Sequence, residues 1–457
     1  MRLRVQASIL FAVLSDPIAA LSTPPGRSAI ALIRLSGRGC FDVAARVLDP
    51  FDSTEPRRLR LSRARRSDTG ERLDDVLYAV FPGPASFTGE DLVEISTHGG
   101  LLAPIEVLAA LQGAGAREAA PGEFTRRALH NGKIDLLQAE AIGDLVDATA
   151  PAQRRAALGQ LDRGLSARIG ELRAQVLDLG ALVSYDIDFP EEDHGPVPPE
   201  RVDAAVRTLQ DALRALTATA AEGERLREGA LCVVAGAPNA GKSSLFNALL
   251  GHERAIVTEI PGTTRDAVEA GAVCGGFPFR LVDTAGLRAS QDRIERLGIE
   301  VSRRYLAAAD VILFCAEAGR ALSPEEGEFL AETRVPVLLV RTKADAAPAL
   351  GDGDVAVSAL TGRGLPALRE RLAALAFARL SATADPGPVL TRERHRAALS
   401  RALEEVTAFA EARRAGLEAA VAATHLTAAV SALEDVIGLV TPDDVLDRVF
   451  ATFCVGK

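Results

Sequence analysis

A glycine-rich segment in the middle of the chain carries residues suited to binding phosphate. The segment Gly236-Ala-Pro-Asn-Ala-Gly-Lys-Ser-Ser244 has the spacing Gly-x-x-x-x-Gly-Lys-Ser, and it lies between the apolar run 231–235 and the helix-like run 245–250. In that context, backbone N–H groups and the positive end of a helix point at a bound anion. We therefore expect Lys242 to reach the β- and γ-phosphates of a nucleotide and Ser243 to hold Mg²⁺.

Four further segments follow in the order that is typical of GTPases. Residues 255–266 have the pattern of a first switch, in which Thr263 or Thr264 can complete the Mg²⁺ shell, and Asp283-Thr-Ala-Gly286 has the pattern of a second switch. In Thr342-Lys-Ala-Asp345 the carboxylate of Asp345 can accept hydrogen bonds from guanine, and Ser358-Ala-Leu360 suits the loop behind the base. Five such segments in order predict GTP binding. The expected nucleotide-binding residues are Asn239, Ala240, Gly241, Lys242, Ser243, Ser244, Thr258, Thr263, Thr264, Asp283, Thr284, Ala285, Gly286, Thr342, Lys343, Asp345, Ser358, Ala359 and Leu360.

Two positions depart from the usual GTPase pattern. Thr342 stands where asparagine is commoner, which predicts a weaker contact with the base. Leu287 stands where Ras-like GTPases have a glutamine that orients the attacking water, so either hydrolysis is slow or another residue positions the water. Glu295 is the candidate for that role, the alternative being a solvated charge on a helix. A cation held by Asn239 could replace an arginine finger.

The surrounding sequence predicts a multidomain chain. Residues 1–118 have mixed α+β patterning, residues 119–228 are helical, residues 229–378 alternate strand and helix, and residues 379–457 return to helix. The alternation predicts a mostly parallel sheet with helices on both faces. Apolar residues at helical spacing form one face over Leu158, Leu161, Leu165, Ile169, Leu172, Val176 and Leu179, and another over Val202, Val206, Leu209, Leu213 and Leu216. The last helical segment is small to fold alone, so we expect it to pack on helices 119–228, which makes the Ras-like P-loop GTPase domain an insertion in a discontinuous helical domain.

The composition argues against several classes of protein. The formal charge of −10 over 457 residues argues against a surface coated with basic residues for gripping nucleic acid. The five scattered cysteines include no C-x-x-C pair, so neither a disulfide framework nor a zinc site is expected, which suits the cytoplasm. Residues 1–14 combine arginines with a short apolar run, which is explained as a signal peptide, a strand or an extension from an early start codon. No stretch is expected to approach a transmembrane helix.

Several short motifs resemble one family, the tRNA-modifying GTPases called MnmE or TrmE, over nearly the whole chain. They are Thr23-Pro-Pro-Gly-Arg27, Phe81-Pro-Gly-Pro84, Ser86-Phe-Thr-Gly-Glu-Asp91, His98-Gly-Gly100, Pro121-Gly-Glu-Phe-Thr125, Asn131-Gly-Lys133, Gln138-Ala-Glu140 and the terminal Phe453-Cys-Val-Gly-Lys457. The resemblance implies an N-terminal domain, residues 1–118, that binds tetrahydrofolate and dimerises. It also implies a discontinuous helical domain, residues 119–228 and 379–457, and an inserted GTPase domain, residues 229–378.

The resemblance also implies roles for individual residues. It places K⁺ near Asn239, Thr258, Ile260 and Thr263, places Mg²⁺ at Ser243 and Thr264, and gives Glu295 the water-orienting role. It assigns the folate, as 5,10-methylenetetrahydrofolate or 5-formyltetrahydrofolate, to Arg34, Glu94, Lys133 and Lys457, and links Cys454 to activity. From the residues alone, ordinary surface ion pairs and an inert packed thiol are the alternatives. Ser28 and Ala29 depart from the two glycines that the family usually shows there.

The function implied is an enzyme that hydrolyses GTP with Mg²⁺ and K⁺ and helps to modify carbon 5 of the wobble uridine of certain tRNAs. The resemblance further implies a homodimer in a heteromeric complex with the FAD-dependent protein MnmG (GidA), which would make most of the tRNA contact. The alternative is a ribosome-assembly GTPase of the Era or Der type, acting as a switch. That class needs a basic RNA-binding module, which the sequence does not show, and it lacks the Pro-Gly-Glu-Phe-Thr and Cys-Val-Gly-Lys motifs.

Overall fold

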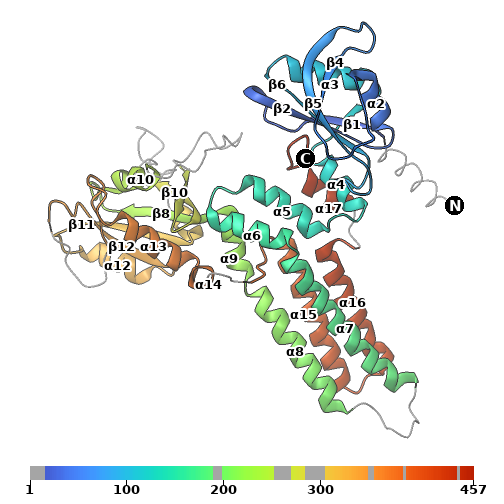
Figure 1. Ribbon diagram of the computed structural model, residues 1–457. Coiled ribbons are helices and arrows are strands. Elements are labelled where there is room, and N and C mark those ends of the chain that lie inside the picture. The colour runs from blue at the N-terminus through green and yellow to red at the C-terminus, as the bar shows by residue number, and fades with distance from the viewer. Residues whose placement is uncertain are drawn as a thin grey trace, which may run out of the picture. The chain divides into compact units, whose positions relative to one another are not determined.

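The computed structural model describes residues 16–188, 198–251, 269–283, 304–347, 355–383, 387–439 and 443–457. These residues divide into two compact units (Figure 1). The first unit joins residues up to Gly143 with those from Ile437 onward, and the second runs from Asp144 to Val436. The two ends of the chain therefore belong to one unit. The four predicted domain boundaries stay predictions.

The first unit is built on a seven-stranded sheet with the order β3-β4-β5-β6-β2-β1-β7. Helices α2 and α3 pack on one face of it, because their apolar residues share a core with the inward-facing residues of β2 and β6, such as Ile33 and Ile95. Helices α4, α5 and α17 complete the unit, and α5 continues into the second unit. The elements are β1 (Ile18–Leu21), β2 (Gly26–Ser36), α2 (Cys40–Val47), β3 (Leu48–Asp49), β4 (Arg60–Arg65), β5 (Arg72–Phe81), β6 (Leu92–Gly100), α3 (Ala103–Gly113), β7 (Arg117–Glu118), α4 (Glu123–His130), α5 (Leu136–Asp147) and α17 (Asp443–Phe450).

The helical part of the second unit joins segments from both sides of the nucleotide-binding part. Its helices are α6 (Pro151–Leu161), α7 (Gly164–Asp188), α8 (Pro199–Thr217), α9 (Ala220–Glu228), α14 (Ala378–Ala382), α15 (Glu393–Arg414) and α16 (Ala419–Ile437). Helices α7, α8, α15 and α16 run alongside one another as a bundle (Figure 1). Across it, the Gln210 side-chain amide donates to the Thr407 hydroxyl at 3.0 Å, and Arg173 pairs with Glu434 at 2.7 Å. The predicted packing of the C-terminal helices on the earlier ones is confirmed.

Most of the residues predicted to form the apolar faces of this bundle are buried. All five residues predicted to face inward on α8 are buried, as are those from Leu165 to Leu179 on α7. Leu158 is an exception, being 44% exposed on α6. The α6–α7 connection runs through residues 162 and 163, and Arg163 has a φ of 64°. A single helical periodicity therefore does not extend from Leu158 into α7.

The nucleotide-binding part of the second unit is a six-stranded sheet with the order β13-β12-β11-β8-β10-β9. All neighbouring strands are parallel except β9 and β10. Helices α10 and α13 share the core on one face, and α12 packs on the other. The elements are β8 (Ala230–Gly236), α10 (Lys242–Leu250), β9 (Glu269–Cys274), β10 (Phe277–Asp283), β11 (Val311–Glu317), α12 (Pro324–Glu332), β12 (Val337–Thr342), β13 (Val355–Ala356) and α13 (Leu365–Ala376). The mostly parallel sheet is confirmed, and the sequence reasoning missed β9.

One described helix has the length and hydropathy that would allow it to cross a membrane, contrary to the sequence-based expectation. It is α16, Ala419–Ile437. Its apolar residues, among them Leu426 and Leu433, are buried on one face, and Glu434 on the same helix pairs with Arg173 of α7. These contacts are those of a bundle helix, so its apolar composition is explained by packing.

Candidate nucleotide and folate sites

The phosphate-binding segment lies where the parallel strands of the second unit end. Strand β8 lies between β10 and β11, and the segment connects its end at Gly236 to the start of α10 at Lys242. Asp283 ends the neighbouring parallel strand β10, in register with Val234 of β8. The order of strands changes direction beside β8, and ligands of open α/β sheets bind at such points. The structure thus brings Lys242, Ser243 and Asp283 to one sheet edge, as predicted.

The backbone of the phosphate-binding segment has the tight geometry that its residue types predict. Gly236 has a φ of 137°, and an added Cβ would lie only 2.3 Å from the Cys315 carbonyl oxygen on β11, so only glycine fits there. Asn239 is left-handed with a φ of 61°, a conformation that asparagine tolerates better than most residues. The Lys242 ammonium donates to the Gly236 and Ala237 carbonyls at 3.0 and 2.7 Å. The lysine therefore lies folded along the segment that is to hold the phosphates.

Two charged side chains, Lys242 and Asp283, act on a buried thiol at this edge. Cys315 is fully buried in β11, two residues before the strand ends, and desolvation raises its pKa to about 12, opposed by the nearby positive charge of Lys242 and reinforced by the negative charge of Asp283. Lys242 and Asp283 are themselves 9% and 4% exposed. The thiol is consequently uncharged, and one ammonium and one carboxylate lie near it at this edge of the sheet.

The loop predicted to bind guanine is connected to the phosphate-binding segment by a hydrogen bond of Thr342. Its hydroxyl, buried at the end of β12, donates to the Ala240 carbonyl at 2.7 Å. The residue where asparagine was expected therefore contacts the phosphate-binding segment, and the prediction of a weaker base contact stays a prediction. Nearby, a hydrogen bond with the Ser358 hydroxyl lowers the pKa of Asp345, which keeps this exposed carboxylate ionised.

Several predicted residues lie outside the described part of the chain. They are Thr258, Ile260, Thr263, Thr264, Thr284, Ala285, Gly286, Leu287 and Glu295. The described members of the set, Asn239 to Ser244, Asp283, Thr342, Lys343, Asp345 and Ser358 to Leu360, all belong to the β8–α10 segment or to loops at the same sheet edge.

A second group of predicted residues lies in the first unit, at Arg34 and Glu94. The two face each other across β2 and β6, and the Arg34 Nε donates to the Glu94 carboxylate at 2.9 Å. Their side chains are 26% and 29% exposed, so a ligand can reach them. The Arg34 guanidinium also lies 6.0 Å from the centre of the Phe87 ring. Sequence reasoning quoted Phe87 within a motif and gave it no role; an aromatic residue next to a glycine-bounded loop is the signal that could have found it.

Lys133 lies close to the loop that carries Phe87. Its ammonium donates to the Pro84 carbonyl at 2.8 Å, and the Asn131 amide donates to the Thr88 carbonyl at 2.7 Å. The Asn131-Gly-Lys133 motif thereby fixes both ends of the loop beside Arg34.

The C-terminal motif is anchored at the end of β1. The Ser22 hydroxyl donates to the Gly456 carbonyl at 3.0 Å. Gly456 has a φ of 93°, and an added Cβ would lie 2.5 Å from the Leu21 carbonyl oxygen, which explains the glycine. In the sheet, Ala20 of β1 lies opposite Arg34. Gly456 therefore contacts Leu21 and Ser22, which are one and two residues after the residue opposite Arg34. Gly456 and Ser22 are more than 400 residues apart in the sequence.

Cys454 is the one exposed cysteine of the five, all of which the structure describes. Its carbonyl lies 3.4 Å from the Gly122 amide at the start of α4. The thiol is accessible, which fits either reading of its role, and the structure does not place it against Arg34 or Glu94.

A buried ionic cluster supports these loops, and sequence reasoning did not find it. Arg127 of α4 is 1% exposed and contacts three carboxylates: Asp16 at 2.9 Å, Glu90 at 3.1 Å and Glu123 at 2.9 Å. Glu123 also accepts from Arg117 at 2.7 Å. Burial raises the pKa of Glu123, but hydrogen bonds from Arg117, the Ala120 amide and Arg127 outweigh it and lower the pKa to about 2. Burial raises the pKa of Glu90, partly offset by Arg127.

Comparison with known proteins identifies the family. The family model described as the MnmE helical domain matches residues 136–454, and the model described as the GTP-binding protein TrmE N-terminus matches residues 17–133. The chain belongs to the MnmE family of tRNA modification GTPases.

Individual relatives match along nearly their whole length. A protein of Methylorubrum populi named tRNA modification GTPase MnmE is 46% identical over 94% of this chain and 96% of the relative. Proteins of the same name from Moorella thermoacetica and Aquifex aeolicus are 40% and 39% identical, each over 97% of this chain and 100% of the relative. Among solved structures, the G domain of the Thermotoga maritima FeoB iron transporter, at 28% identity and a TM-score of 0.24, covers 32% of this chain and 98% of its own.

Membership of the MnmE family confirms the predicted family, the predicted combination of an N-terminal, a helical and a P-loop GTPase domain, and the predicted class of enzyme. The Era- or Der-type alternative is set aside, because the match includes both terminal regions. The roles of the individual site residues stay predictions.

Proposed function

We propose that this chain hydrolyses GTP in a K⁺-dependent manner to drive a modification of tRNA. With an FAD-dependent partner, it would add a carboxymethylaminomethyl-type group to carbon 5 of the wobble uridine of certain tRNAs, using a tetrahydrofolate one-carbon unit. The observation that carries the proposal is that a chain of the MnmE family has two separate groups of suitable side chains. One group lies at the nucleotide edge of the second unit, and the other lies around Arg34 and Glu94 in the first.

The nucleotide edge supplies groups for binding and orienting GTP. Lys242 would leave the carbonyls of its own loop for the phosphate oxygens, and the N–H groups at the start of α10 would complete the cradle. Asp345, kept ionised by Ser358, would accept from the guanine N–H groups. Thr342 would keep the base loop and the phosphate loop in register.

The donor set also fits two metal ions. Ser243 at the first turn of α10 and Asp283 at the end of β10 offer hard oxygen ligands to Mg²⁺, together with Thr264. The left-handed Asn239 offers an amide oxygen to K⁺, together with Thr258, Ile260 and Thr263. These cations, when bound, neutralise charge that develops on the phosphates. Glu295 would orient the attacking water in place of the glutamine that Leu287 replaces.

The group around Arg34 fits a reduced folate. A pterin presents adjacent N–H groups, which can donate hydrogen bonds to the Glu94 carboxylate. Arg34 holds that carboxylate in one orientation. Phe87 supplies an aromatic face next to it. The anionic glutamate tail would suit Lys133 or Lys457, both of which lie on segments anchored to this part of the unit. Bound folate would carry the one-carbon unit, and Cys454 is proposed to act nearby.

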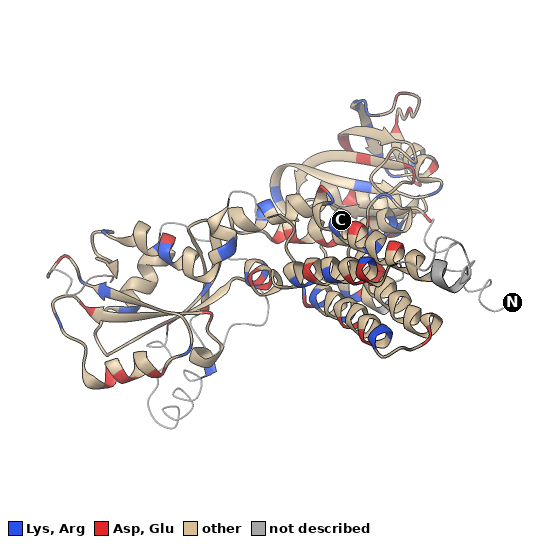
Figure 2. Cartoon of the chain, turned by 90° about the horizontal axis from the view of Figure 1, so that it is seen from below, with Lys and Arg blue, Asp and Glu red and all other residues tan. Residues whose placement is uncertain are grey.

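The proposed partners are inferred from the charge of this chain and from its family. Acidic and basic residues are interspersed along the described helices (Figure 2), and the net charge is −10. A surface of this kind suits a chain that leaves most of the tRNA contact to a partner, proposed to be MnmG in a complex with a homodimer of this chain. The proposed location is the cytoplasm.

Two measurements test the proposal. GTP hydrolysis by the full chain should be faster in KCl than in NaCl, and Asn239→Gly should remove the K⁺ stimulation, because glycine keeps the left-handed backbone and removes the side-chain amide with its oxygen. Equal turnover in the two salts would refute the K⁺ dependence. Calorimetric binding of 5-formyltetrahydrofolate should be lost in Glu94→Gln and kept in Glu55→Gln, a carboxylate that pairs with Arg58 at the surface. Unchanged binding in Glu94→Gln would refute the folate site.

A further inference from the structure

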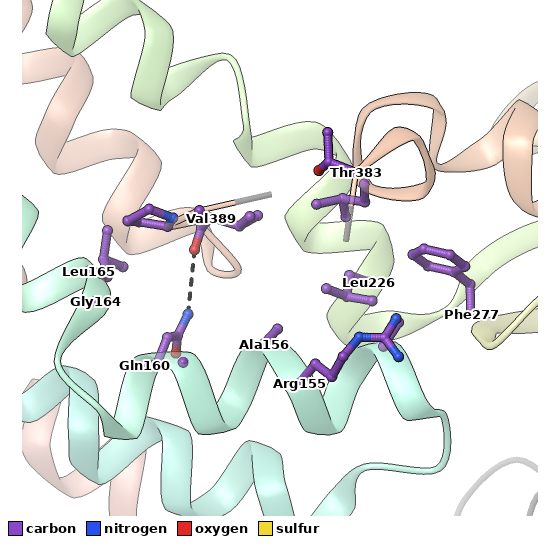
Figure 3. A pocket seen from close by; sticks show the side chains of 14 residues that line it. Arg155, Ala156, Gln160, Gly164, Leu165, Leu226, Phe277, Thr383 and Val389 are labelled. Atoms are coloured by element: carbon purple, nitrogen blue, oxygen red, sulfur yellow. Dashed lines mark hydrogen bonds between the residues drawn. The ribbon is translucent and has the colours of Figure 1, made fainter. Parts of the chain in front are cut away.

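A cavity of about 440 Å³ lies in the second unit, away from the nucleotide edge. It is bordered by α6, the start of α7, α9, the first residue of β10, α14 and residues 383 and 387–389 (Figure 3). Phe277 at the cavity and Asp283 at the nucleotide edge are opposite ends of β10, which puts them about 20 Å apart at the usual rise per residue. The cavity is thus separate from the residues proposed to bind GTP.

Much of the cavity wall is apolar. Leu165, Leu226 and Phe277 contribute side chains to it, and Phe277 stacks on Phe377 with ring centres 4.6 Å apart. Gly159 also lines the cavity, and a Cβ added there would meet no atom within 4 Å, so there is room for a larger side chain at this position. A volume of this size lies within the range of small-molecule sites, roughly 300–1,000 Å³.

A single cation lines this apolar space. The Arg155 side chain lies beside Leu226 and Phe277 (Figure 3). It is exposed, and no carboxylate in the described part of the chain lies within ion-pair distance of it. On the other side, the buried Gln160 amide donates only long hydrogen bonds, 3.3 Å to Thr391 and 3.4 Å to the Val389 carbonyl. The charge of the site is therefore positive and its body hydrophobic.

We propose that this cavity binds a small organic monocarboxylate with an apolar body, of the class of the medium-chain fatty acids. The carboxylate pairs with the Arg155 guanidinium, which binds carboxylates through two parallel hydrogen bonds. The hydrocarbon body lies against Leu226 and Phe277, where burial of apolar surface supplies the remaining affinity.

The position of the cavity gives such a ligand a defined effect. Both chain connections between the helical bundle and the nucleotide-binding sheet flank it: α9 with Leu226 leads directly into β8, and Thr383 and Val389 lie on the return segment after α14. A bound carboxylate joins these two connections through one set of contacts. It should therefore slow amide exchange in both connections, without contacting the nucleotide.

The test is calorimetric titration of the full-length chain with octanoate and with octan-1-ol, a neutral molecule of the same chain length. Octanoate should bind at one site per chain, and Gly159→Leu, which fills the cavity from a regular helix, should abolish binding. Arg155→Gln should weaken octanoate about tenfold, the loss of a charge-assisted hydrogen bond, and change octan-1-ol binding less than twofold. The matched controls are Gly170→Leu, where an added Cβ also meets open space, and Arg154→Gln, neither of which lines the cavity; both should bind as wild type.

Three outcomes would overturn the proposal. The first is an absence of saturable octanoate binding, and the second is binding that Gly159→Leu leaves unchanged. The third concerns Asp385, which lies outside the described residues between Thr383 and Gly387. If Asp385→Asn strengthens octanoate binding, Arg155 pairs with the Asp385 carboxylate in the free protein. In that case Arg155 is not an unpaired cation that serves to bind a ligand.

Discussion

Replacement of Arg127 by methionine removes the centre of the buried ionic cluster in the first unit. The guanidinium is 1% exposed and contacts Asp16, Glu90 and Glu123. Methionine keeps much of the buried volume, so the change tests the charge and its hydrogen bonds. Breaking a buried ion pair from one side leaves an uncompensated charge and costs about 3–5 kcal/mol.

The pKa of Glu123 gives an independent magnitude. Its lowering from 4.5 to about 2 corresponds to about 3 kcal/mol of stabilisation of the carboxylate, shared among Arg117, the Ala120 amide and Arg127. Arg127 supplies part of this and also holds Glu90 and Asp16. We therefore expect Arg127→Met to lower the free energy of unfolding of the first unit by about 3 kcal/mol at neutral pH.

Hydrogen exchange followed by mass spectrometry measures this in the full chain, because it reports each unit separately. Peptides from β2 and β6 should exchange about a hundredfold faster in Arg127→Met, while those from α8 and α15 are unchanged. The neighbouring Arg126→Met is the matched control: Arg126 pairs at 2.8 Å with the exposed Asp447, and its loss should cost less than about 1 kcal/mol. Equal exchange in the two variants, or no change in Arg127→Met, would refute the reasoning.

Three further predictions concern Thr342, Glu123 and Cys454. Thr342→Val removes the hydroxyl that donates to the Ala240 carbonyl, so GDP should bind about tenfold more weakly by calorimetry; unchanged affinity would show that the tether is unimportant. Because the pKa of Glu123 is lowered on folding, its contribution is present above about pH 4.5 and lost as pH falls towards 2; the extra exchange caused by Glu123→Gln should thus shrink between pH 6 and pH 3, and a constant difference would contradict this. Brief treatment of the native protein with iodoacetamide should alkylate Cys454 alone, since the other four cysteines are buried; mass spectrometry finding Cys40 or Cys315 modified at the same rate would contradict the burial.

Much of the nucleotide-binding part could be predicted because its signals are local. The glycine spacing, the apolar strands and their order specify a parallel sheet with Asp283 beside the phosphate loop, and the structure has this arrangement. Strand β9 was missed because Glu269-Ala-Gly-Ala-Val-Cys274 is short and contains glycine, and it is stabilised by pairing with β10 through a turn at Gly275 and Gly276. Such pairing is a tertiary effect that the segment itself does not encode.

The second site illustrates what local patterns cannot show. Arg34 and Glu94 could be named from a family resemblance, but their contact depends on the register of β2 and β6, which are joined by more than 50 residues. Arg127 gave no signal, because an arginine on an amphipathic helix is usually exposed. Its burial arises from three carboxylates, which lie just before β1, in the loop before β6 and on α4.

The most direct test of the central claim is mass spectrometry of tRNA wobble uridines from a strain in which the gene for this chain has been deleted. The account predicts that the carboxymethylaminomethyl-type mass increment disappears and returns when the wild-type chain is supplied. It predicts no return with Lys242→Ala, which lacks the phosphate-binding ammonium. Wobble uridines with unchanged modification in the deletion strain would contradict the account.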